Sequence, residues 1–571
     1  DQHGRHLETR HGLTGAVVLS FEYDPLGRLT GVVDGDGNRT LIERLSTGEA
    51  TAVVAPLGYR TALGMEDGVM TSVQDPSGRS TRFAYDQGLM TSVSSPLNAT
   101  FEFFYDASGE LESATAPNGL RVDLSRTPDN AVRLAVGARF TDIAFTRTAN
   151  QDRVTEARSS DGNVVRTVAT RLATRRTQLP GGATLDLSTA PDPRFGQLAA
   201  YASQRTQSQV GGPTLQSSQS ITADLADPKD PFSFTTLTMS RTVGTRTTAQ
   251  EYNAAARSMT TTTPVGRSRV RHLDTQGRTV QTDVPGRLPT TYRYTSHGLL
   301  EAVEQGARSR SYTYDAQGNL EVAVNARGET EHYEHDAVGR ETEHRFPDGR
   351  RVQFEYDATG RLSAVTPPGA QKSSFVYDGA DQLREEQLPA LDGAPFTILR
   401  DYDAQGRPTT TTWPDGSSVQ TTYDPDGRPL AVDLGAHGEV RFEYDTIGTP
   451  VATTITGGAR VEQTYEGGAL RGMAWSGPVN GSTYGVTGMA DGRLMGWDVN
   501  GVRVVDLGYD DDGLLISAGP VTLQHDPANA DLVGTTVQQV TESFTRTAVG
   551  DVERQHAVLG AAGWVEWSYT R

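Results

Sequence analysis

The densest group of side chains with a capacity for chemistry is the segment Glu331-His332-Tyr333-Glu334-His335. Imidazole and carboxylate groups are common zinc ligands, and two histidines this close together could share one ion. On a β-strand, however, His332 and His335 are an odd number of residues apart and point to opposite faces. A zinc site that uses both needs a helix or a distorted strand. We therefore interpret His335 as a substitute for a repeated tyrosine, and the segment as structural.

Two acidic segments are similar to the beginning of a calcium-binding loop. In the first, Asp34-Gly35-Asp36-Gly37-Asn38, position six is Arg39 where such a loop needs glycine, and position twelve is Leu45 where it needs glutamate. The second, Asp510-Asp511-Asp512-Gly513, has the composition of a turn with at most adventitious cation binding. We predict hairpin turns at both places, and we expect no metal and no cofactor.

Other catalytic patterns are equally weak. Asp274-Thr275 and Asp445-Thr446 lack the glycine that follows this pair in an aspartic protease, and the chain has neither a G-x-S-x-G elbow nor a phosphate-binding loop. The absence of cysteine excludes disulfides, thiolate catalysis and cysteine-ligated zinc. We predict that the chain is not an enzyme, and the alternative of an enzymatic site within residues 125–250 is the weaker one.

The most frequent reactive pair is Tyr-Asp, and its frequency argues against catalysis. A catalytic residue occurs once or twice in a chain, whereas a pair that recurs throughout it has a structural task. We expect the tyrosine to pack between neighbouring hairpins and the aspartate to hold a turn. The pairs are Tyr23-Asp24, Tyr85-Asp86, Tyr105-Asp106, Tyr314-Asp315, Tyr356-Asp357, Tyr377-Asp378, Tyr402-Asp403, Tyr423-Asp424, Tyr444-Asp445 and Tyr509-Asp510.

These pairs belong to an internal repeat of about 21 residues. The phrase FEYDATGRLSAV at Phe354 returns as FEYDPLGRLTGV at Phe21 and as FEYDTIGTPVAT at Phe442. In the C-terminal half the tyrosine positions, two of them occupied by Leu273 and His335, follow one another at steps of 20 or 21 residues from Tyr252 to Tyr465, apart from one step of 25 between Tyr377 and Tyr402. A fixed period of this length is the signature of a repeat architecture. In the N-terminal part the glycines keep the same phase, at Gly27, Gly48, Gly68, Gly88 and Gly109.

Each repeat contains two turns and two short strands. Asp357 to Gly360 is the first kind of turn, and Pro347-Asp348-Gly349 is the second. Between turns, Phe354 and Tyr356 share one face and Glu355 the other, an alternation typical of a β-strand. After the turn, Leu362 and Val365 are three residues apart, which breaks the alternation and predicts a β-bulge.

The repeat predicts an all-β fold of tandem β-hairpins. A single hairpin is marginally stable, so neighbouring repeats must pair edge to edge and form a spiralling sheet that curls into a hollow shell or large barrel. Alternation tells which residues share a face but not which face is inside. We divide the shell into an N-terminal part at 1–124, diverged Thr/Ser-rich repeats at 125–250 and a C-terminal part at 251–571. An inserted domain is the alternative for the middle stretch.

Composition agrees with a thin wall. Hydrophobic residues make up 36% of the chain, which is lean for a solid core of 571 residues. The net charge is −19, from 52 basic and 71 acidic residues, and the sequence shows no basic patch, so nucleic acid is a poor partner. No apolar stretch approaches the length of a membrane span. Both ends read as cut within a repeat, so we expect a piece of a longer chain.

Tyr-Asp-x-x-Gly-Arg-Leu at this spacing resembles the YD-repeat family, which includes bacterial Rhs proteins, the B and C components of insecticidal toxin complexes, and teneurins. The resemblance implies a hollow β-shell that encloses a C-terminal toxin or effector in bacterial members and belongs to an adhesion receptor in teneurins. Rhs-type shells end in an Asp-Pro-x-Gly cleavage motif. Here Asp24-Pro25, Asp75-Pro76 and Asp424-Pro425 begin ordinary repeat turns, so self-cleavage is not carried over.

The favoured function is therefore a non-catalytic scaffold of a secreted bacterial protein that encloses a polypeptide cargo, such as a toxin or effector. The partners expected are that cargo or missing parts of the same chain. The alternative is a teneurin-like cell-surface module, whose exterior would bind a surface protein or a glycan. The expected location is secreted or at the bacterial cell surface.

Overall fold

The computed structural model describes residues 1–210, 212, 214–391, 393–466, 469–478, 482–490, 493–560 and 563–569. Within these residues the chain forms 52 strands in one sheet, and helix is confined to two short 3-10 segments, Pro180–Gly182 and Gly435–His437. Each strand pairs antiparallel with the strand that follows it in the chain, from β1 with β2 to β51 with β52. The all-β fold predicted from the repeat is confirmed.

The strands form a spiral whose successive coils lie against each other. The first coil comprises β1 (Glu8–Arg10), β2 (Val17–Tyr23), β3 (Leu29–Asp34), β4 (Arg39–Arg44), β5 (Ala50–Val54), β6 (Arg60–Glu66), β7 (Val69–Gln74), β8 (Ser80–Asp86), β9 (Leu89–Ser94), β10 (Thr100–Tyr105), β11 (Leu111–Thr115), β12 (Arg121–Arg126), β13 (Val132–Val136), β14 (Arg139–Arg147), β15 (Arg153–Ser159), β16 (Val164–Ala169), β17 (Thr174–Gln178), β18 (Thr184–Asp192), β19 (Gly196–Ser208), β20 (Leu215–Leu225), β21 (Phe234–Val243), β22 (Arg246–Asn253) and β23 (Ser258–Thr262).

The second coil comprises β24 (Ser268–Leu273), β25 (Thr279–Asp283), β26 (Thr290–Tyr294), β27 (Leu300–Gln305), β28 (Arg308–Tyr314), β29 (Leu320–Val324), β30 (Thr330–His335), β31 (Glu341–Arg345), β32 (Arg351–Tyr356), β33 (Leu362–Thr366), β34 (Ser373–Tyr377), β35 (Leu383–Leu391), β36 (Ala394–Tyr402), β37 (Pro408–Thr412), β38 (Ser418–Tyr423), β39 (Pro429–Asp433), β40 (Glu439–Tyr444), β41 (Pro450–Ile455), β42 (Ala459–Glu466), β43 (Ala469–Ser476), β44 (Thr483–Ala490), β45 (Arg493–Val499) and β46 (Val502–Tyr509). A third begins with β47 (Leu515–Ala518), β48 (Val521–His525), β49 (Leu532–Val537), β50 (Val540–Arg546), β51 (Val552–Leu559) and β52 (Gly563–Ser568).

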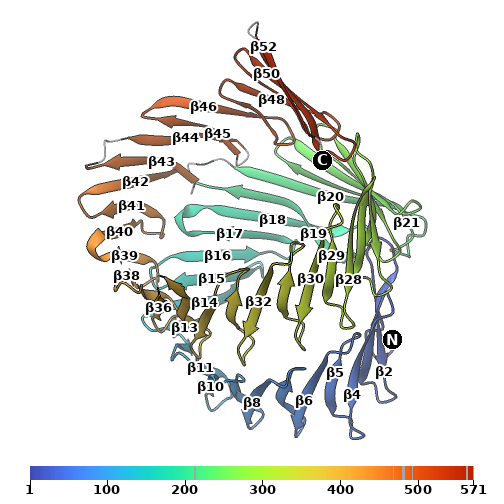
Figure 1. Ribbon diagram of the computed structural model, residues 1–571. Helices are drawn as coiled ribbons and strands as arrows, with labels where there is room; N and C mark the ends of the chain where they lie inside the picture. The colour runs from blue at the N-terminus through green and yellow to red at the C-terminus, as the bar shows by residue number, and fades with distance from the viewer. Residues whose placement is uncertain are drawn as a thin grey trace.

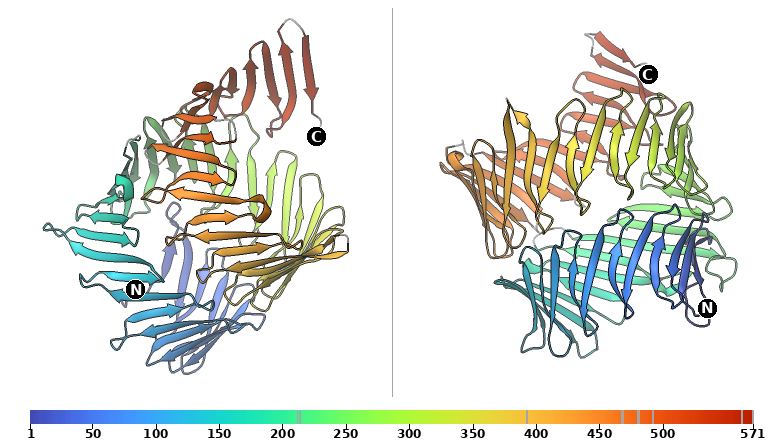
Figure 2. Two further views of the ribbon diagram at one scale, coloured as in Figure 1. Left: turned by 90° about the vertical axis from the view of Figure 1, so that its left-hand side faces the viewer. Right: turned by 60° about the horizontal axis from the view of Figure 1, so that its bottom comes forward.

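Figure 1 shows the path of this spiral: blue strands run along the bottom, teal strands lead to the green strands at the right, and yellow strands cross the front to the orange strands at the left. The red C-terminal strands lie at the top. In the right panel of Figure 2 the yellow and orange strands of the second coil lie above the blue and teal strands of the first. The sheet does not close on itself into a barrel. The spiralling sheet expected from the sequence is therefore present as an open coil.

A β-bulge sits at the same place in successive repeats and explains the curvature. Phe354 pairs with Val365 and Glu355 with Ala364, but Tyr356 pairs with Leu362, which leaves Ser363 as the extra residue. This is the bulge predicted from the spacing of Leu362 and Val365. The same shift precedes the repeat tyrosine in the hairpins β2–β3, β28–β29 and β40–β41. Because a bulge increases local twist, its repetition drives the sheet into a coil.

The wall is a single sheet with little conventional core. The chain exposes 32654 Å², whereas a compact monomer of this mass exposes about 20,000 Å². The largest buried cluster comprises Phe234, Leu237, Tyr252, Met259 and Leu273, on β21 to β24. Leu13 from the start of the chain packs against this cluster, so the beginning of the first coil is fixed to the end of the same coil and to the first strand of the second.

Two departures from the repeat length have simple structural causes. The step of 25 residues between Tyr377 and Tyr402 falls at the hairpin β35–β36, whose strands have nine residues each. In the middle stretch the strands also lengthen, to 13 residues in β19 and 11 in β20. These strands pair in sequence with their neighbours on both sides, so the stretch 125–250 continues the same sheet. Among the described residues, no helix has the length and apolarity to cross a bilayer.

Candidate functional site

The repeated aspartate organises its turn through both carboxylate oxygens. Oδ1 of Asp357 accepts hydrogen bonds from the backbone N–H of Thr359 at 2.9 Å and of Arg361 at 3.0 Å. Oδ2 accepts a hydrogen bond from Nε of Arg361 at 2.7 Å. Gly360 closes the turn with a φ of 96°, a conformation that favours glycine. One carboxylate thus fixes both the turn and the arginine that follows it.

That arginine reaches the tyrosine of the next repeat. The guanidinium of Arg340, held by Asp336, lies 4.3 Å from the ring centroid of Tyr356. The hydroxyl of Tyr356 donates a 2.8 Å hydrogen bond to the backbone carbonyl of Glu341, the residue after that arginine. Tyr356 is therefore bound by the preceding hairpin through both its ring and its hydroxyl. The same stacking joins Arg5 to Tyr23, Arg278 to Tyr294, Arg361 to Tyr377, Arg384 to Tyr402, Arg407 to Tyr423, Arg428 to Tyr444, and Arg493 to Tyr509.

Some of the Tyr-Asp pairs vary this arrangement. Tyr85 and Tyr105 keep the hydroxyl bond, to the carbonyls of Met70 and Met90. Asp86 ends β8 and pairs with Leu89 across a two-residue turn. The carboxylates that also accept turn hydrogen bonds from backbone N–H groups are those of Asp24, Asp106, Asp315, Asp378, Asp403, Asp424, Asp445 and Asp510. Tyr314 and Tyr444 donate to the carbonyls of Leu300 and Pro429.

The turn geometry sets the ionisation of these aspartates. Partial burial opposes the charged form of Asp357, but hydrogen bonds from the Thr359 hydroxyl and from Arg361 outweigh it and lower its pKa to about 2. Partial burial also opposes ionisation of Asp403, and the hydrogen bonds from Arg407 again produce a net lowering of the pKa. A pKa held low by fixed donors is typical of a structural ion pair, since a general base needs a pKa near the working pH.

Removing a single hydroxyl should test the coupling between hairpins. The substitution Tyr356→Phe keeps the ring under Arg340 but leaves the Glu341 carbonyl without this donor, so we expect a loss of about 1 kcal/mol. Hydrogen exchange of β31 and β32 measures this loss locally. Tyr356→Leu, which also removes the aromatic ring, should cost more. Equal exchange in the wild type and Tyr356→Phe would contradict the coupling.

The segment from Glu331 to His335, considered above as a zinc site, does not bring its side chains together as metal ligands among the described residues. His332 pairs with Arg345 on one face of β30, and the bulge before His335 places His335 in the tyrosine position of the repeat. Glu331 instead accepts hydrogen bonds from the Tyr333 hydroxyl at 2.7 Å and engages Nε2 of His344 at 3.0 Å. In the part of the chain that the structure describes, no three His, Asp or Glu side chains are grouped as metal ligands.

The acidic turns have a different use, which the sequence did not reveal. Asp36, in the loop similar to a calcium site, pairs with Arg278 of the second coil at 2.9 Å. Asp510 and Asp512 both pair with Arg267. Arg287 pairs with Asp531 and Arg308 with Asp551. These ion pairs join turns of successive coils, and we call this line of contact the seam.

The seam brings together residues that are far apart in the chain. Hydrogen bonds across it link Gln276 with Gly35, 241 residues away, and Asn118 with Ala404, 286 residues away. No sequence motif marks these separations of 241 and 286 residues. The number of residues in one coil depends on the small twists of all its hairpins added together. The same turns that define each repeat therefore also hold the coils together.

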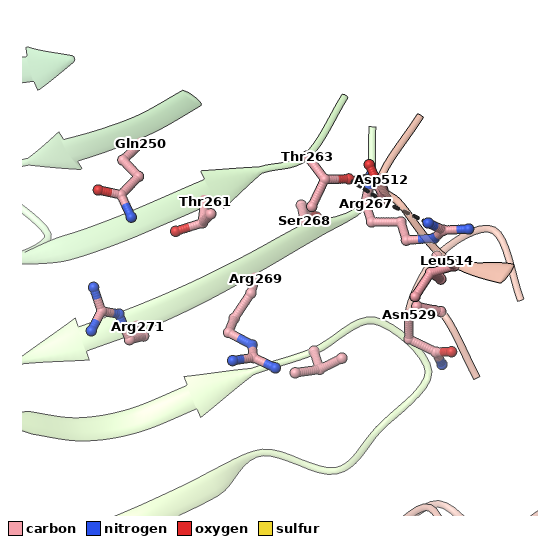
Figure 3. A pocket seen from close by; sticks show the side chains of 13 residues that line it. Gln250, Thr261, Thr263, Arg267, Ser268, Arg269, Arg271, Asp512, Leu514 and Asn529 are labelled. Carbon is pink, nitrogen blue, oxygen red and sulfur yellow. Dashed lines mark hydrogen bonds and ion pairs between the residues drawn. The ribbon is translucent and has the colours of Figure 1, made fainter. Parts of the chain in front are cut away.

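A pocket of about 570 Å³ opens at the seam where the end of the first coil and the start of the second meet the third (Figure 3). Thr263 and Arg267 contact Asp512 at its edge, where Leu514 and Asn529 belong to the third coil. Gln250, Thr261, Arg269 and Arg271 line the side formed by β22 to β24. The lining is polar and cationic rather than that of an acid–base centre.

The cations of this pocket correct one expectation from the sequence. We expected no basic patch, yet the fold gathers on one face arginines from several strands whose side chains make no hydrogen bond or ion pair within the described residues. They are Arg153, Arg175, Arg205, Arg241, Arg269 and Arg271. Sequence reasoning missed them because they are spread over more than a hundred residues. The signal that could have found them is the recurrence of arginine at the same alternate strand position in the Thr-rich stretch.

A family model of known proteins identifies the family of this chain. The family model described as the teneurin YD-shell matches residues 1–487. The chain belongs to the teneurin YD-shell family. No curated protein matches the sequence.

Solved structures show the same shell architecture. A crystal structure of TcdB2-TccC3-Cdc42 is similar to this YD-shell chain with a TM-score of 0.56 and 11% identity, over 96% of this chain and 37% of that one. A crystal structure of TcdB2-TccC3 matches with a TM-score of 0.50 and 12% identity, over 96% and 35%. The YD-shell chain thus spans little more than a third of the length of these proteins. At such low identity the likeness establishes the fold.

Proposed function

We propose that this YD-shell chain is the wall of a non-catalytic, secreted bacterial scaffold that encloses a polypeptide cargo such as a toxin or effector. The observation that carries the proposal is the single-layer coiled wall, with its large accessible surface of 32654 Å². A single-layer wall of this kind can surround a large volume, whereas a globular fold of the same length would bury most of its side chains in a core. The TcdB2-TccC3 structures support the proposal through their fold.

The non-catalytic part of the proposal is supported by the use of the reactive residues. The Tyr-Asp pairs act in turns and in stacking between hairpins, and the acidic turns act in the seam. We also propose that residues 1–124, 125–250 and 251–571 are three parts of one shell, since the middle strands continue the ladder without a break. The partners that fit are an enclosed polypeptide or further parts of the same chain.

Particle shape and protection together test enclosure. Electron microscopy of the chain should show a rounded particle with low central density, and a solid rod or flat ribbon would refute the shell. A protease-sensitive reporter polypeptide fused after Arg571 should be cut much more slowly than the free reporter. Arg267→Ala, which weakens the seam, should restore cutting, whereas Arg350→Ala at an exposed pair should not. Equal cutting of fused and free reporter would exclude enclosure.

The teneurin-like alternative keeps the same wall but uses its exterior. The description of the matching family model favours it, since that description names teneurins. Under this alternative the chain would bind a cell-surface protein or glycan and would leave a fused reporter unprotected. Specific binding to cells together with a fully cut reporter would favour adhesion over enclosure.

A further inference from the structure

Three of the unpaired arginines stand in one row across five strands. Ala169 is the direct partner of both Arg153 and Arg175, and Leu187 is the direct partner of both Arg175 and Arg205. Side chains of direct cross-strand partners lie on the same face of an antiparallel sheet. Arg153, Arg175 and Arg205 therefore project side by side from β15, β17 and β19.

Three more arginines extend this row on the same face. Arg205 pairs with Ser217, and two residues further along β20 Gln219 pairs with Arg241. From β21 the same face continues through the pairs Met239–Gln250, Gln250–Thr261 and Thr261–Arg269. Arg271 follows two positions after Arg269 on β24. We call the six arginines the basic belt, and its last two line the pocket of Figure 3.

The belt carries uncompensated charge. All six side chains are exposed, and within the described residues none of them makes a hydrogen bond or ion pair. The carboxylates of these strands lie on the opposite face, at Asp142, Glu156, Asp186, Asp224 and Glu251. There Asp186 pairs with Arg176, Asp142 with Arg133 and Glu156 with Arg158, and Asp224 accepts a hydrogen bond from the Thr236 hydroxyl.

This arrangement costs stability without a structural return. Arg147 is the direct partner of Arg153, and like charges directly opposite each other destabilise a sheet. A chain of net charge −19 has many carboxylates, yet the described residues of β14 to β24 place none on this face. The belt is thus complementary to an acidic partner that the chain itself does not supply within the described residues.

We propose that the basic belt binds an acidic polypeptide segment in extended conformation. Alternate strands of a sheet are about 10 Å apart. A peptide in the extended polyproline II conformation advances about 3.1 Å per residue with three residues per turn, so every third side chain points the same way. A peptide crossing β15, β17 and β19 therefore presents a carboxylate to each arginine of the row when every third residue is acidic. Duplex DNA carries phosphates about every 3.4 Å along each strand, much more densely than the row, and is repelled by the net charge.

The inference deepens the proposed function, because it takes the acidic segment to be part of the enclosed cargo, and in that respect it rests on the proposed function. The binding of an acidic segment to the belt does not depend on enclosure. Its test uses fluorescence anisotropy with a labelled peptide of about 18 residues that has glutamate at every third position and Gly-Ser between. A second peptide has the same composition with its glutamates in one block. A third replaces glutamate with lysine, and a short DNA duplex is the competing polyanion.

The wild type should bind the spaced peptide more tightly than the block peptide and should not bind the lysine peptide. The triple substitution Arg153→Gln, Arg175→Gln and Arg205→Gln should weaken binding about tenfold, since each exposed pair contributes a fraction of that. A matched control is Arg82→Gln, Lys229→Gln and Arg327→Gln, which removes the same charge at exposed side chains without ion pairs. It should retain binding within about twofold.

If both triple variants weakened peptide binding equally, or if neither weakened it, the belt would be refuted as a binding site. Tighter binding of DNA with the same dependence on Arg153, Arg175 and Arg205 would overturn the polypeptide assignment. The envelope and protection experiments involve none of these arginines. A hollow particle that fails to bind the spaced peptide would refute the belt alone, whereas peptide binding by a flat ribbon would refute enclosure alone.

Discussion

Arg267→Ala should detach the third coil from the second. Nη1 of Arg267 lies 2.9 Å from Oδ2 of Asp510 and also contacts Asp512. The side chain of Arg267 is 11% exposed, and those of the two aspartates are 15% and 9% exposed. Removal of the cation leaves two carboxylates close together without their counter-ion, and loss of one partner of a buried pair costs about 3–5 kcal/mol.

Scattering and hydrogen exchange measure this opening. Arg267→Ala should increase the radius of gyration and speed exchange in β47 to β52, while β2 to β12 exchange as before. The control is Arg350→Ala, because the ion pair of Arg350 with Asp348 is 69% and 50% exposed and contributes at most about 1 kcal/mol. An unchanged particle after Arg267→Ala would show that the remaining seam contacts suffice, contrary to this expectation.

Asp357→Ala should locally unfold the hairpin β32–β33 and weaken its union with the next one. The change removes four hydrogen bonds to Asp357 and frees Arg361, whose guanidinium lies 4.8 Å from the Tyr377 ring. We expect a loss of about 2–3 kcal/mol, since hydrogen bonds to charged groups contribute about 1.5–3 kcal/mol each and are not additive. Hydrogen exchange of β32 to β34 measures it.

The appropriate control is Asp129→Ala. Asp129 is an exposed turn residue whose carboxylate makes no hydrogen bond among the described residues, so its loss should change stability by less than about 0.5 kcal/mol. Equal effects of the two substitutions would mean that the turn carboxylate does not hold the repeat.

The same carboxylate gives a signed pH dependence. The folded pKa of Asp357 is about 2, below the ordinary value of 3.8. A depressed pKa contributes stability that is fully present above the unfolded value and is lost as the pH falls through the folded one. The pKa values of Asp336, Asp403 and Asp424 are lowered as well. Acid unfolding between about pH 4 and pH 2 should therefore be shallower in Asp357→Ala than in the wild type.

The local features were predictable because their causes are local. Bonds from Asp357 reach only two to four residues along the chain, so the spacing Asp-x-x-Gly-Arg shows the turn directly. The alternation around Phe354 shows the strand, and the interval from Leu362 to Val365 shows the bulge, as the pairing of Tyr356 with Leu362 confirms. The role of the arginine was not foreseen, since its target ring lies in the next repeat.

The coil and its charged surfaces were decided by tertiary structure. The partners of Arg267 are more than 240 residues away, at a distance set by the accumulated twist of all the hairpins between them. The hydrogen bonds within each turn are local and do not depend on this accumulated twist, so the turn motif does not predict which turns meet across the seam. The basic belt arises in the same way, because Arg153, Arg175 and Arg205 become neighbours only through the pairing registers of β15 to β19. The sequence by itself determined the repeating unit, and the summed geometry of many units decided which turns meet and which charges gather.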